Sequence, residues 1–401
     1  MKRIVFIITI ILLLTSAITT GCQKPISTHD VQNPKSPAPD IEQGSQLLQN
    51  STPDLEYPDF VIIKGVEYST SLDTLELVAC GLTEEDIVSL QYMSDLKILD
   101  LTGNQISDIS QLSSLSNLEE LYIFGNSIND ITPLSSLTNL KSLSLRNNLV
   151  SDVTPLANLT KLESLRLEEN SIVDITPLAG LTSLVELNLG ENLVSDIMPL
   201  ASLASLEGLW LYCNSISDIS SLADLTNLIE LNLTDNNISD ISPLADLVGI
   251  KHLNITGNQI SDISPLSGLV NLEELSLSGD SISMLPDIVD NPISDIKALP
   301  GLTKLRYLQL AQTYTSDITP LSSLTSLESL ILSVNEISDI TPLASLINLK
   351  ELELNCNKIS DISPLTGLTN LSWLGLGDNL IHDWSPVEHV LEVAGRPYTV
   401  N

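Results

Sequence analysis

Positive charge, aromatic side chains, histidine and cysteine are all scarce in this sequence. The 401 residues contain 17 Lys and Arg against 51 Asp and Glu, which gives a formal net charge of −34 at pH 7. Nucleic-acid binding relies on Lys and Arg that neutralise phosphates, so this composition excludes a nucleic-acid partner. Only 3% of the residues are aromatic although 43% are hydrophobic. A hydrophobic fraction made almost entirely of Leu and Ile indicates internal repetition.

The few histidines and cysteines give little support for catalysis or cross-linking. The chain has four His and four Cys, and no Ser or Cys nucleophile motif accompanies a histidine. Cys213 and Cys356 lie about six repeats apart, or roughly 30 Å at the spacing of β-strands, which is beyond disulfide reach. We therefore predict a protein that is not an enzyme, has no cofactor, and leaves Cys80, Cys213 and Cys356 without disulfides.

The first residues resemble a bacterial export signal. Lys2 and Arg3 precede an apolar stretch that is too short for a comfortable membrane span. Gly21 and Cys22 resemble the lipobox of bacterial lipoproteins, with Thr19 where that pattern favours Leu. The resemblance implies a signal peptide over 1–21, a lipid on Cys22, and attachment to the outer face of the bacterial membrane or cell surface. A secreted product and an uncleaved anchor are the alternatives.

Residues 22–56 are rich in Pro, Ser, Asn and Gln and show no sustained apolar period. This composition predicts a flexible tether between the anchor and the folded part of the chain. We expect contact with a membrane only through the lipid on Cys22.

From about residue 96 the sequence repeats itself every 22 residues. The unit reads Leu-x-x-Leu-x-Leu-x-x-Asn-x-Ile-x-Asp-Ile-x-Pro-Leu, and such a period decides the architecture before any local pattern. Asp280 and Thr313 fill the Asn position in two units, and Cys80 fills it in an earlier unit of 24 residues. The Asn itself recurs at Asn104, Asn126, Asn148, Asn170, Asn192, Asn214, Asn236, Asn258, Asn335, Asn357 and Asn379.

Each unit predicts one short strand and one tight return. Leu121 and Ile123 alternate with Tyr122 and Phe124, so the first pair points into the core and the second pair points out. The Asn amide has donors and an acceptor that can bond to the backbone of neighbouring turns. Ser or Thr before Pro favours a one-turn 3-10 helix on the return. Stacked units then supply one another's core.

This pattern resembles the leucine-rich repeat family, and its Ile-x-Asp-Ile-x-Pro-Leu return is similar to the internalin-type repeats of bacterial surface proteins. The resemblance implies an α/β-type repeat solenoid, a right-handed superhelix with one parallel β-sheet on the concave face and short 3-10 or loop returns. We expect an N-terminal cap and first irregular repeat over 57–95, the array over 96–383 and a C-terminal cap over 384–401. An interval of 33 residues between Asp280 and Thr313 predicts an insertion over 284–294, either a contact loop or a bend.

Two acidic patterns invite a metal interpretation, and we favour a structural one for both. An Asp recurs once per turn, as at Asp130 and Asp240, where its side chain can bond to backbone two residues on; weak calcium stabilisation is the alternative. Glu230, His252 and Glu274 fall at the same position of three successive strands. A solvated, charge-matched row explains them better than a metal site, because no second shell is visible.

The outward side of the strands is the predicted binding surface. All aromatic residues between Asn104 and Asn379 except Tyr314 fall on it, and Trp, Tyr and Arg dominate binding hot spots. The alternative is that the rings only stiffen the sheet by cross-strand pairing. The predicted ligand-binding residues are Tyr122, Phe124, Arg146, Arg166, Glu168, Glu186, Asn188, Trp210, Tyr212, Tyr307 and Trp373.

These observations predict a surface protein that binds a partner without altering it chemically. The resemblance to internalins implies a protein partner, on a host or a neighbouring cell. A glycan or cell-wall polymer stacked on Trp210, Tyr212 and Trp373 is one alternative, and a structural envelope protein without a dedicated ligand is another.

Overall fold

The computed structural model describes residues 58–279 and 291–396. The predicted signal peptide, Cys22, the tether and most of the predicted insertion lie outside the described residues. Within the two ranges no helix is long and apolar enough to cross a membrane.

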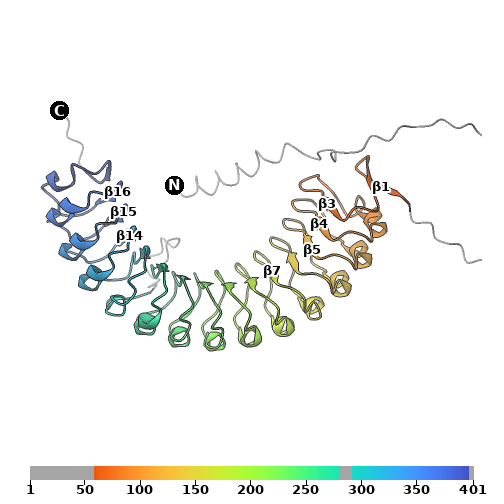
Figure 1. The fold of residues 1–401 in the computed structure, drawn as a ribbon, viewed down its shortest axis with the longest axis horizontal. Helices are drawn as coiled ribbons and strands as arrows, with labels where there is room; N and C mark the ends of the chain where they lie inside the picture. Colours follow the sequence, from red (N-terminus) through yellow and green to blue (C-terminus); the bar gives the residue numbers. More distant parts are fainter. Residues whose placement is uncertain (1–57, 280–290, 397–401) are drawn as a thin grey trace, which may run out of the picture.

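One parallel sheet of 15 strands lines the inner side of an arc (Figure 1). The strands follow one another in chain order, and each pairs with its equivalent one turn later, as Leu121 does with Leu143. The strands are β3 (Thr74–Glu76), β4 (Ile98–Asp100), β5 (Glu120–Tyr122), β6 (Ser142–Ser144), β7 (Ser164–Arg166), β8 (Glu186–Asn188), β9 (Gly208–Trp210), β10 (Glu230–Asn232), β11 (His252–Asn254), β12 (Glu274–Ser276), β13 (Tyr307–Gln309), β14 (Ser329–Ile331), β15 (Glu351–Glu353), β16 (Trp373–Gly375) and β17 (Glu392–Ala394).

The outer side of the arc is built from short 3-10 helices, and the described residues contain no α-helix (Figure 1). Most of these helices begin at Ser or Thr followed by Pro, whose preset backbone angle suits the first helical positions. The prediction of one strand and one 3-10 return per unit is confirmed except between β12 and β13, where Lys297 and Ala298 stand in place of the Ser/Thr-Pro pair and the return is a plain turn. The helices are η1 (Val88–Tyr92), η2 (Ser110–Ser114), η3 (Thr132–Ser136), η4 (Thr154–Leu156), η5 (Thr176–Gly180), η6 (Met198–Ser202), η7 (Ser220–Leu222), η8 (Ser242–Leu244), η9 (Ser264–Gly268), η10 (Thr319–Ser323), η11 (Thr341–Ser345), η12 (Ser363–Gly367) and η13 (Ser385–Val387).

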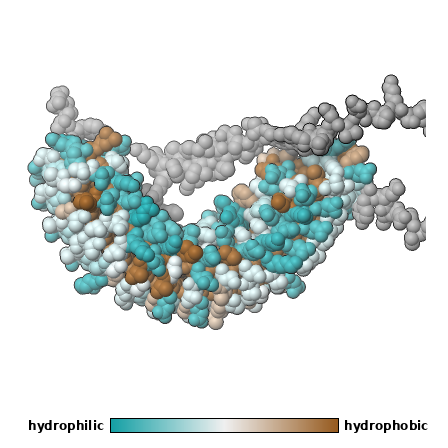
Figure 2. Space-filling model, in the orientation of Figure 1, coloured by the Kyte–Doolittle hydropathy of each residue, from teal (hydrophilic) through white to brown (hydrophobic). Residues whose placement is uncertain are grey.

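The repeated Leu and Ile side chains form continuous buried rows between sheet and returns. Leu121, Leu165 and Leu187 from the strands, and Ile128 and Leu134 from the returns, are all fully buried. No single turn could bury these faces, so each turn depends on its two neighbours for its core. The visible face of the solenoid is otherwise mostly hydrophilic, with scattered apolar patches (Figure 2).

The recurring Asn forms a ladder of hydrogen bonds along the interior. The Oδ1 of Asn258 accepts from Ile238 N at 3.0 Å, and its Nδ2 donates to the carbonyls of Leu233 and Ile255 at 2.9 and 3.1 Å. Asn258 is 1% exposed. The ladder Asn thus supplies the acceptor for a buried backbone N–H and shares its carbonyls with the neighbouring ladder Asn, since Leu233 O also accepts from Asn236 Nδ2 and Ile255 O from Asn291 Nδ2.

The recurring Asp closes a turn at the start of each return. Asp130 and Asp240 each accept a hydrogen bond at 2.8 Å from the backbone N–H two residues on. Hydrogen bonds from the hydroxyl and the backbone N–H of Thr132 hold the pKa of Asp130 below its ordinary value, and those from the backbone N–H and the hydroxyl of Ser242 do the same for Asp240. The Asx-turn interpretation of this column agrees with the geometry.

The ladder corrects the predicted position of the insertion. Asn291, not Asp280, occupies the ladder position of this turn: its Oδ1 accepts from Ile260 N at 3.0 Å, and its Nδ2 donates to Ile255 O at 2.8 Å. Ile293, assigned above to the insertion over 284–294, is fully buried in the regular row. An ionised carboxylate has no donor for the carbonyls that Asn291 serves, which explains why an Asn is needed here. The extra residues therefore precede Asn291.

The two ends of the array are closed differently. At the N-terminal end β1 (Phe60–Ile63) and β2 (Val66–Ser69) form an antiparallel hairpin that buries Val61, Ile63 and Tyr68. At the other end the segment predicted as a separate cap over 384–401 still follows the repeat, because Asp383 closes the usual turn and β17 pairs with β16. The described part of that segment is one more turn of the solenoid, with Trp384 packed against the core.

Candidate functional site

The predicted binding residues occupy three outward columns of the sheet. The register places Tyr122, Arg166, Asn188 and Trp210 in the middle column, since Tyr122 pairs with Ser144, Ser144 with Arg166, and so on to Trp210. Phe124, Arg146, Glu168 and Tyr212 form the column two residues further along the chain, and Glu186 lies in the column that begins the strands.

Nine of the predicted residues lie on adjacent strands, and two do not. Strands β5 to β9 carry all of the former on the concave side (Figure 1). Tyr307 on β13 and Trp373 on β16 belong to the far arm of the arc, separated from β9 by β10, β11 and β12. We call the first group the β5–β9 patch; it consists of Tyr122, Phe124, Arg146, Arg166, Glu168, Glu186, Asn188, Trp210 and Tyr212.

Two rings of the patch lie against glycines of the sheet. A Cβ atom added to Gly208 would come within 2.5 Å of Trp210 Cη2, and one added to Gly190 would collide with the ring of Tyr212. The indole Nε1 of Trp210 also donates to Glu230 Oε1 at 2.8 Å. Aromatic side chains commonly cover strand glycines in this way. The rings are therefore half-buried and held in place, and need little further ordering when a partner binds.

The other two aromatic residues of the patch are also held by neighbours. Tyr122 Oη donates to Glu120 Oε2 at 2.7 Å. The guanidinium carbon of Arg146 lies 5.0 Å from the centre of the Phe124 ring, a cation–π contact worth about 0.5–1 kcal/mol at an exposed site.

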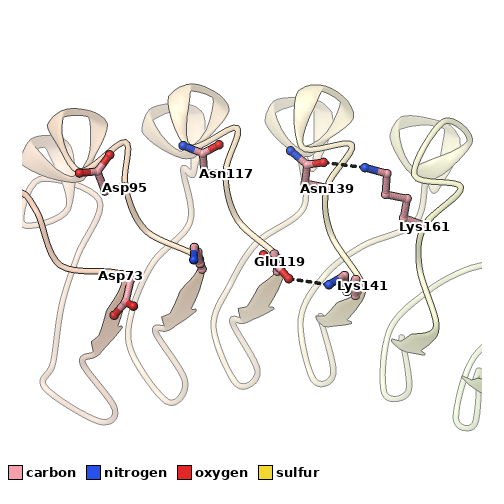
Figure 3. A pocket seen from close by; sticks show the side chains of 8 residues that line it. Asp73, Asp95, Asn117, Glu119, Asn139, Lys141 and Lys161 are labelled. Carbon is pink, nitrogen blue, oxygen red and sulfur yellow. Dashed lines mark hydrogen bonds and ion pairs between the residues drawn. The ribbon is translucent and has the colours of Figure 1, made fainter.

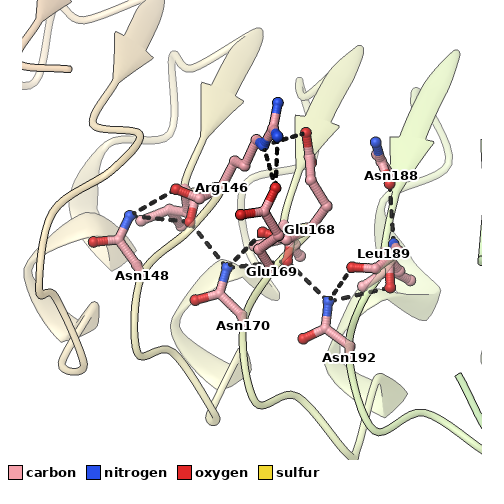
Figure 4. Close-up of polar contacts among 11 residues, drawn as sticks. Arg146, Asn148, Glu168, Glu169, Asn170, Asn188, Leu189 and Asn192 are labelled. Carbon is pink, nitrogen blue, oxygen red and sulfur yellow. Dashed lines mark hydrogen bonds and ion pairs between the residues drawn. The ribbon is translucent and has the colours of Figure 1, made fainter. Parts of the chain in front are cut away.

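Arg146 links this ring to a pair of acidic residues (Figure 4). Its Nε and Nη2 both donate to Glu169 Oε1, at 2.8 and 2.5 Å. The Oε1 of Glu168 is 3.8 Å from Arg146 Nε. Glu169 follows the strand in a left-handed backbone conformation, with φ of 58°, at the position where other turns have Gly.

Glu168 is the most unusual polar residue of the patch. It is only 3% exposed, and its Oε2 has no hydrogen-bond partner among the described residues. Burial raises the pKa of Glu168 above its ordinary value, against the smaller opposing effects of its own backbone N–H and of the charges on Arg146 and Arg166. Burial also raises the pKa of Tyr212, helped by the negative charge of Glu168.

Arg166 contrasts with Arg146. Arg166 is exposed in the centre of the patch. It forms no ion pair and no side-chain hydrogen bond with any residue that the structure describes. Its charge is therefore available to an incoming partner.

The row of Glu230, His252 and Glu274 is brought together but is used differently. The three residues are direct neighbours on β10, β11 and β12. His252 Nδ1 contacts Glu274 Oε2 at 3.3 Å, whereas Glu230 bonds to Trp210. Across the described residues, no cluster of three or more His, Cys, Asp or Glu has an arrangement that could hold a metal.

Sequence reasoning missed a groove on the edge where the chain enters the strands (Figure 3). Within it Lys141 Nζ bonds to Glu119 Oε2 at 2.6 Å, and Lys161 Nζ donates to Asn139 Oδ1 at 2.7 Å. The signal was present in the sequence, because Lys97, Glu119 and Lys141 alternate in charge at one position of successive turns. Of these charges Lys141 and Glu119 form an ion pair, and Lys161 bonds to a neutral amide, so the groove is an exposed row of small charge contacts and not a built ligand site.

Sequence models of the leucine-rich repeat match most of the array. Two such models, described as leucine-rich repeats in two copies and as a leucine-rich repeat, match residues 116–158, 160–202, 204–246, 248–288 and 325–367, and residues 70–128. No match was found among curated proteins.

Solved structures agree with the models. An internalin, inlF of Listeria monocytogenes, is 32% identical, with coverage of 84% of this chain and 91% of that one and a TM-score of 0.65. InlJ of the same species is 21% identical, with coverage of 81% and 72% and a TM-score of 0.64. The ectodomain of the Arabidopsis thaliana receptor kinase GASSHO1/SCHENGEN3, in complex with CASPARIAN STRIP INTEGRITY FACTOR 2, is 20% identical, with coverage of 80% and 43% and a TM-score of 0.60.

The models cover more than half of the chain, and the similarity to inlF extends over nearly all of the described solenoid. The chain therefore belongs to the leucine-rich repeat family, and its repeats are like those of the internalins.

Proposed function

We propose that this chain is a non-catalytic binding protein of the bacterial cell surface, which recognises a protein partner through the β5–β9 patch. One observation carries the proposal. Aromatic rings that are half-buried on glycines, and an arginine without an ion pair, gather on five adjacent strands of the concave sheet. Rigid rings beside Arg are the composition of binding hot spots.

The size of the patch supports a protein partner. Tyr122 and Tyr212 are four inter-strand steps apart, which is about 20 Å at ordinary strand spacing. A standard protein interface buries about 800 Å² on each partner, and a patch of this span can supply that area. The plant receptor ectodomain, which shares only the fold, also carries a bound protein factor.

The localisation is part of the same proposal and rests on the sequence. A lipid on Cys22 would hold the solenoid outside the cell membrane, at the end of the tether over 22–56. Metabolic labelling with a clickable fatty acid should mark the wild-type protein and not a Cys22→Ala variant. Equal labelling of both would remove the anchor from the proposal and leave a secreted or signal-anchored protein.

A pull-down with matched variants tests the binding surface. Immobilised wild-type protein should retain a partner from a cell-surface protein extract, and Trp210→Ala with Tyr212→Ala should abolish that retention. Tyr307→Ala with Trp373→Ala removes the same ring types from the far arm and should leave it intact. Loss with both pairs, or with neither, would contradict the assignment to the β5–β9 patch.

A glycan remains the second candidate, because flat rings beside carboxylates also suit sugars. Trp210 has this arrangement, with Glu230 bonded to its indole nitrogen. Retention of purified wall polymer in place of a protein, lost in the same Trp210→Ala and Tyr212→Ala variant, would favour it. If that variant keeps its fold and changes neither binding nor phenotype, a structural envelope role is the better description.

A further inference from the structure

The repeats provide their own standard for which surface residues are unusual. The positions one and three residues after the ladder Asn lie on the edge where the chain leaves the strands, which we call the strand-exit edge. From the turn of Asn104 to that of Asn258 these positions are mostly polar: Gln105, Ser107, Ser127, Asn129, Ser151, Ser171, Ser195, Ser215, Ser217, Asn237, Ser239, Gln259 and Ser261.

Three successive turns break this pattern. Leu149, Val173 and Leu193 stand at these positions and are 58%, 57% and 57% exposed. The core does not require them, because the Ile and Leu rows of the same turns are already buried. Leu380 and Tyr314 occupy the first of the two positions in the far arm, but three turns apart from each other. Among the residues that the structure describes, only the turns of β6, β7 and β8 carry exposed apolar residues at this pair of positions in three successive turns.

The apolar cluster adjoins the β5–β9 patch. Leu149, Val173 and Leu193 come three, five and three residues after Arg146, Glu168 and Gly190. The ladder residues Asn148, Asn170 and Asn192 lie between them in the sequence, and Figure 4 shows these Asn beside Arg146 and Glu168. Three successive turns span about 10 Å along the edge. One partner can therefore contact the concave rings and this edge together.

Glu168 supplies the second, independent observation. Its Oε2 is buried without a partner, and the nearest cation, Arg146, is engaged by Glu169. A buried carboxylate oxygen without a donor destabilises a protein, because its desolvation is not compensated. A donor brought by a partner would remove that penalty, on displacement of the exposed end of Arg146. Glu186 and Glu191 add negative charge to the adjacent turn, which opposes the positive charge of Arg166 near Glu168. A cationic donor makes the strongest hydrogen bond to an ionised carboxylate, so it is favoured.

We propose that the binding surface continues from the β5–β9 patch over the strand-exit edge, and that it takes a cationic, amphipathic protein segment. In this arrangement a Lys or Arg of the partner pairs with Glu168, and neighbouring apolar side chains of the partner cover Leu149, Val173 and Leu193. The inference rests on the proposed function and narrows the chemistry of its partner.

A library of random 12-residue peptides displayed on phage tests the inference without knowledge of the natural partner. Selection on the purified full chain should enrich peptides in which Lys or Arg stands beside apolar residues. Synthetic copies of those peptides should bind at least tenfold more weakly to Glu168→Gln, and to the triple variant Leu149→Ser, Val173→Ser and Leu193→Ser. Leu380→Ser, at the same repeat position and 61% exposed, is the matched control and should change the affinity by less than about twofold.

The outcomes separate this inference from the proposed function. Selection of acidic peptides, of no peptides, or of peptides whose affinity is the same for the edge variants and the wild type would overturn the inference. In the last case, loss of binding with Trp210→Ala and Tyr212→Ala would still support the concave patch. If the edge variants weaken binding and the ring variant does not, the edge is the site and the patch is wrong. Thermal unfolding of each variant separates these results from loss of the fold.

Discussion

The two arms of the concave sheet share a backbone and differ in what they display. In the N-terminal arm, β5 to β9 gather aromatic rings, two arginines and the buried Glu168 on adjacent strands. In the C-terminal arm, Tyr307 on β13 donates to Gln309 at 2.9 Å. Trp373 lies three strands further on, on β16, where its ring is close to Gly375 of the same strand. Identical scaffolding thus carries a dense surface on one arm and a sparse one on the other, and the difference comes from side chains that the fold does not need.

The edges of the two arms differ less. Lys141 pairs with Glu119 in the N-terminal arm, and Arg306 and Lys350 both pair with Glu328 in the C-terminal arm, at 2.9 and 2.6 Å. Exposed pairs of this kind contribute little to stability, because water screens their charges. Charge alternation on the strand-entry edge is therefore a common feature of the solenoid, whereas the β5–β9 patch is local.

The largest expected effect is on stability and concerns the ladder that both arms share. Asn258→Ala leaves Ile238 N buried without an acceptor, whereas Leu233 O keeps the hydrogen bond from Asn236 Nδ2 at 3.1 Å, and we expect a loss of about 2–3 kcal/mol in the free energy of unfolding. The C-terminal arm tolerates Thr313 at the same position because Thr315 assists it through a hydroxyl contact of 2.9 Å.

Asn258→Thr tests that comparison, since its turn has no equivalent of Thr315. It should fall between wild type and Asn258→Ala in urea unfolding. Wild-type stability for Asn258→Thr would show that a hydroxyl suffices anywhere in the ladder.

The second effect is on binding. Arg166→Glu should weaken affinity for the retained protein partner by at least tenfold, or about 1.4 kcal/mol, because we expect an acceptor group of that partner to face this exposed guanidinium. Because Arg166 is exposed and forms no ion pair within the described part of the chain, its reversal should barely change unfolding. Arg306→Glu reverses a charge in the other arm and should leave affinity unchanged, as measured by surface plasmon resonance. Equal losses from both variants would reduce the effect to overall charge.

A smaller effect is expected from methyl groups placed beneath the two tryptophans. Gly208→Ala puts a Cβ 2.5 Å from Trp210, and Gly375→Ala puts one 3.0 Å from Trp373 and 2.5 Å from the Asn355 side chain. Both rings should shift, at about 1 kcal/mol of overpacking or somewhat more, and both variants should alter tryptophan fluorescence. Only Gly208→Ala should reduce affinity, by several-fold. A reduction with Gly375→Ala would mean that the second arm also contacts the partner.

The smallest effects are opposite responses to acid. The raised pKa of Glu168 means that its charge opposes folding above that pKa, and the opposition disappears as pH falls below the ordinary value of 4.5. Acidification from pH 7 to 4 should therefore raise the free energy of unfolding of the wild type relative to that of Glu168→Gln.

Asp240 should respond in the opposite direction. Because its pKa is lowered in the folded state, its charge stabilises the fold above the ordinary value of 3.8, and this stabilisation is lost as pH falls through the lowered value. Asp240→Asn keeps the Oδ1 acceptor and cannot be protonated in this range. The free energy of unfolding of the wild type should therefore fall relative to that of Asp240→Asn between pH 5 and 3. Urea unfolding at these pH values checks both signs.

Much of the fold could be predicted from the period of the sequence. The spacing of Leu121 and Ile123 assigns the buried rows, and the ladder Asn and the turn-closing Asp follow from their hydrogen-bonding groups. The position of the insertion could not be found by spacing, since Asp280 lies 22 residues after Asn258 and Asn291 lies 22 before Thr313. Only the need for an amide donor distinguishes the two residues. The sequence already shows that Asn291 has such a donor and Asp280 does not.

The candidate site was less predictable. Its columns follow from the alternation along each strand, and the sequence correctly placed the patch residues on the concave side. Contacts between different turns could not be predicted in this way. Tyr212 covers Gly190, Glu169 binds Arg146, and neighbouring turns bury Glu168. Rotamers and neighbours decide such contacts, and a one-dimensional pattern contains neither.

Repetition alone was enough to establish a stacked solenoid, its hidden rows and its displayed columns, because each of these depends on a period that survives in one dimension. Which displayed residues are flat, paired, or buried without a donor became known only from the stacked turns. Those properties depend on which side chains the adjacent turn places within a few ångströms, and the period of the sequence does not contain this information.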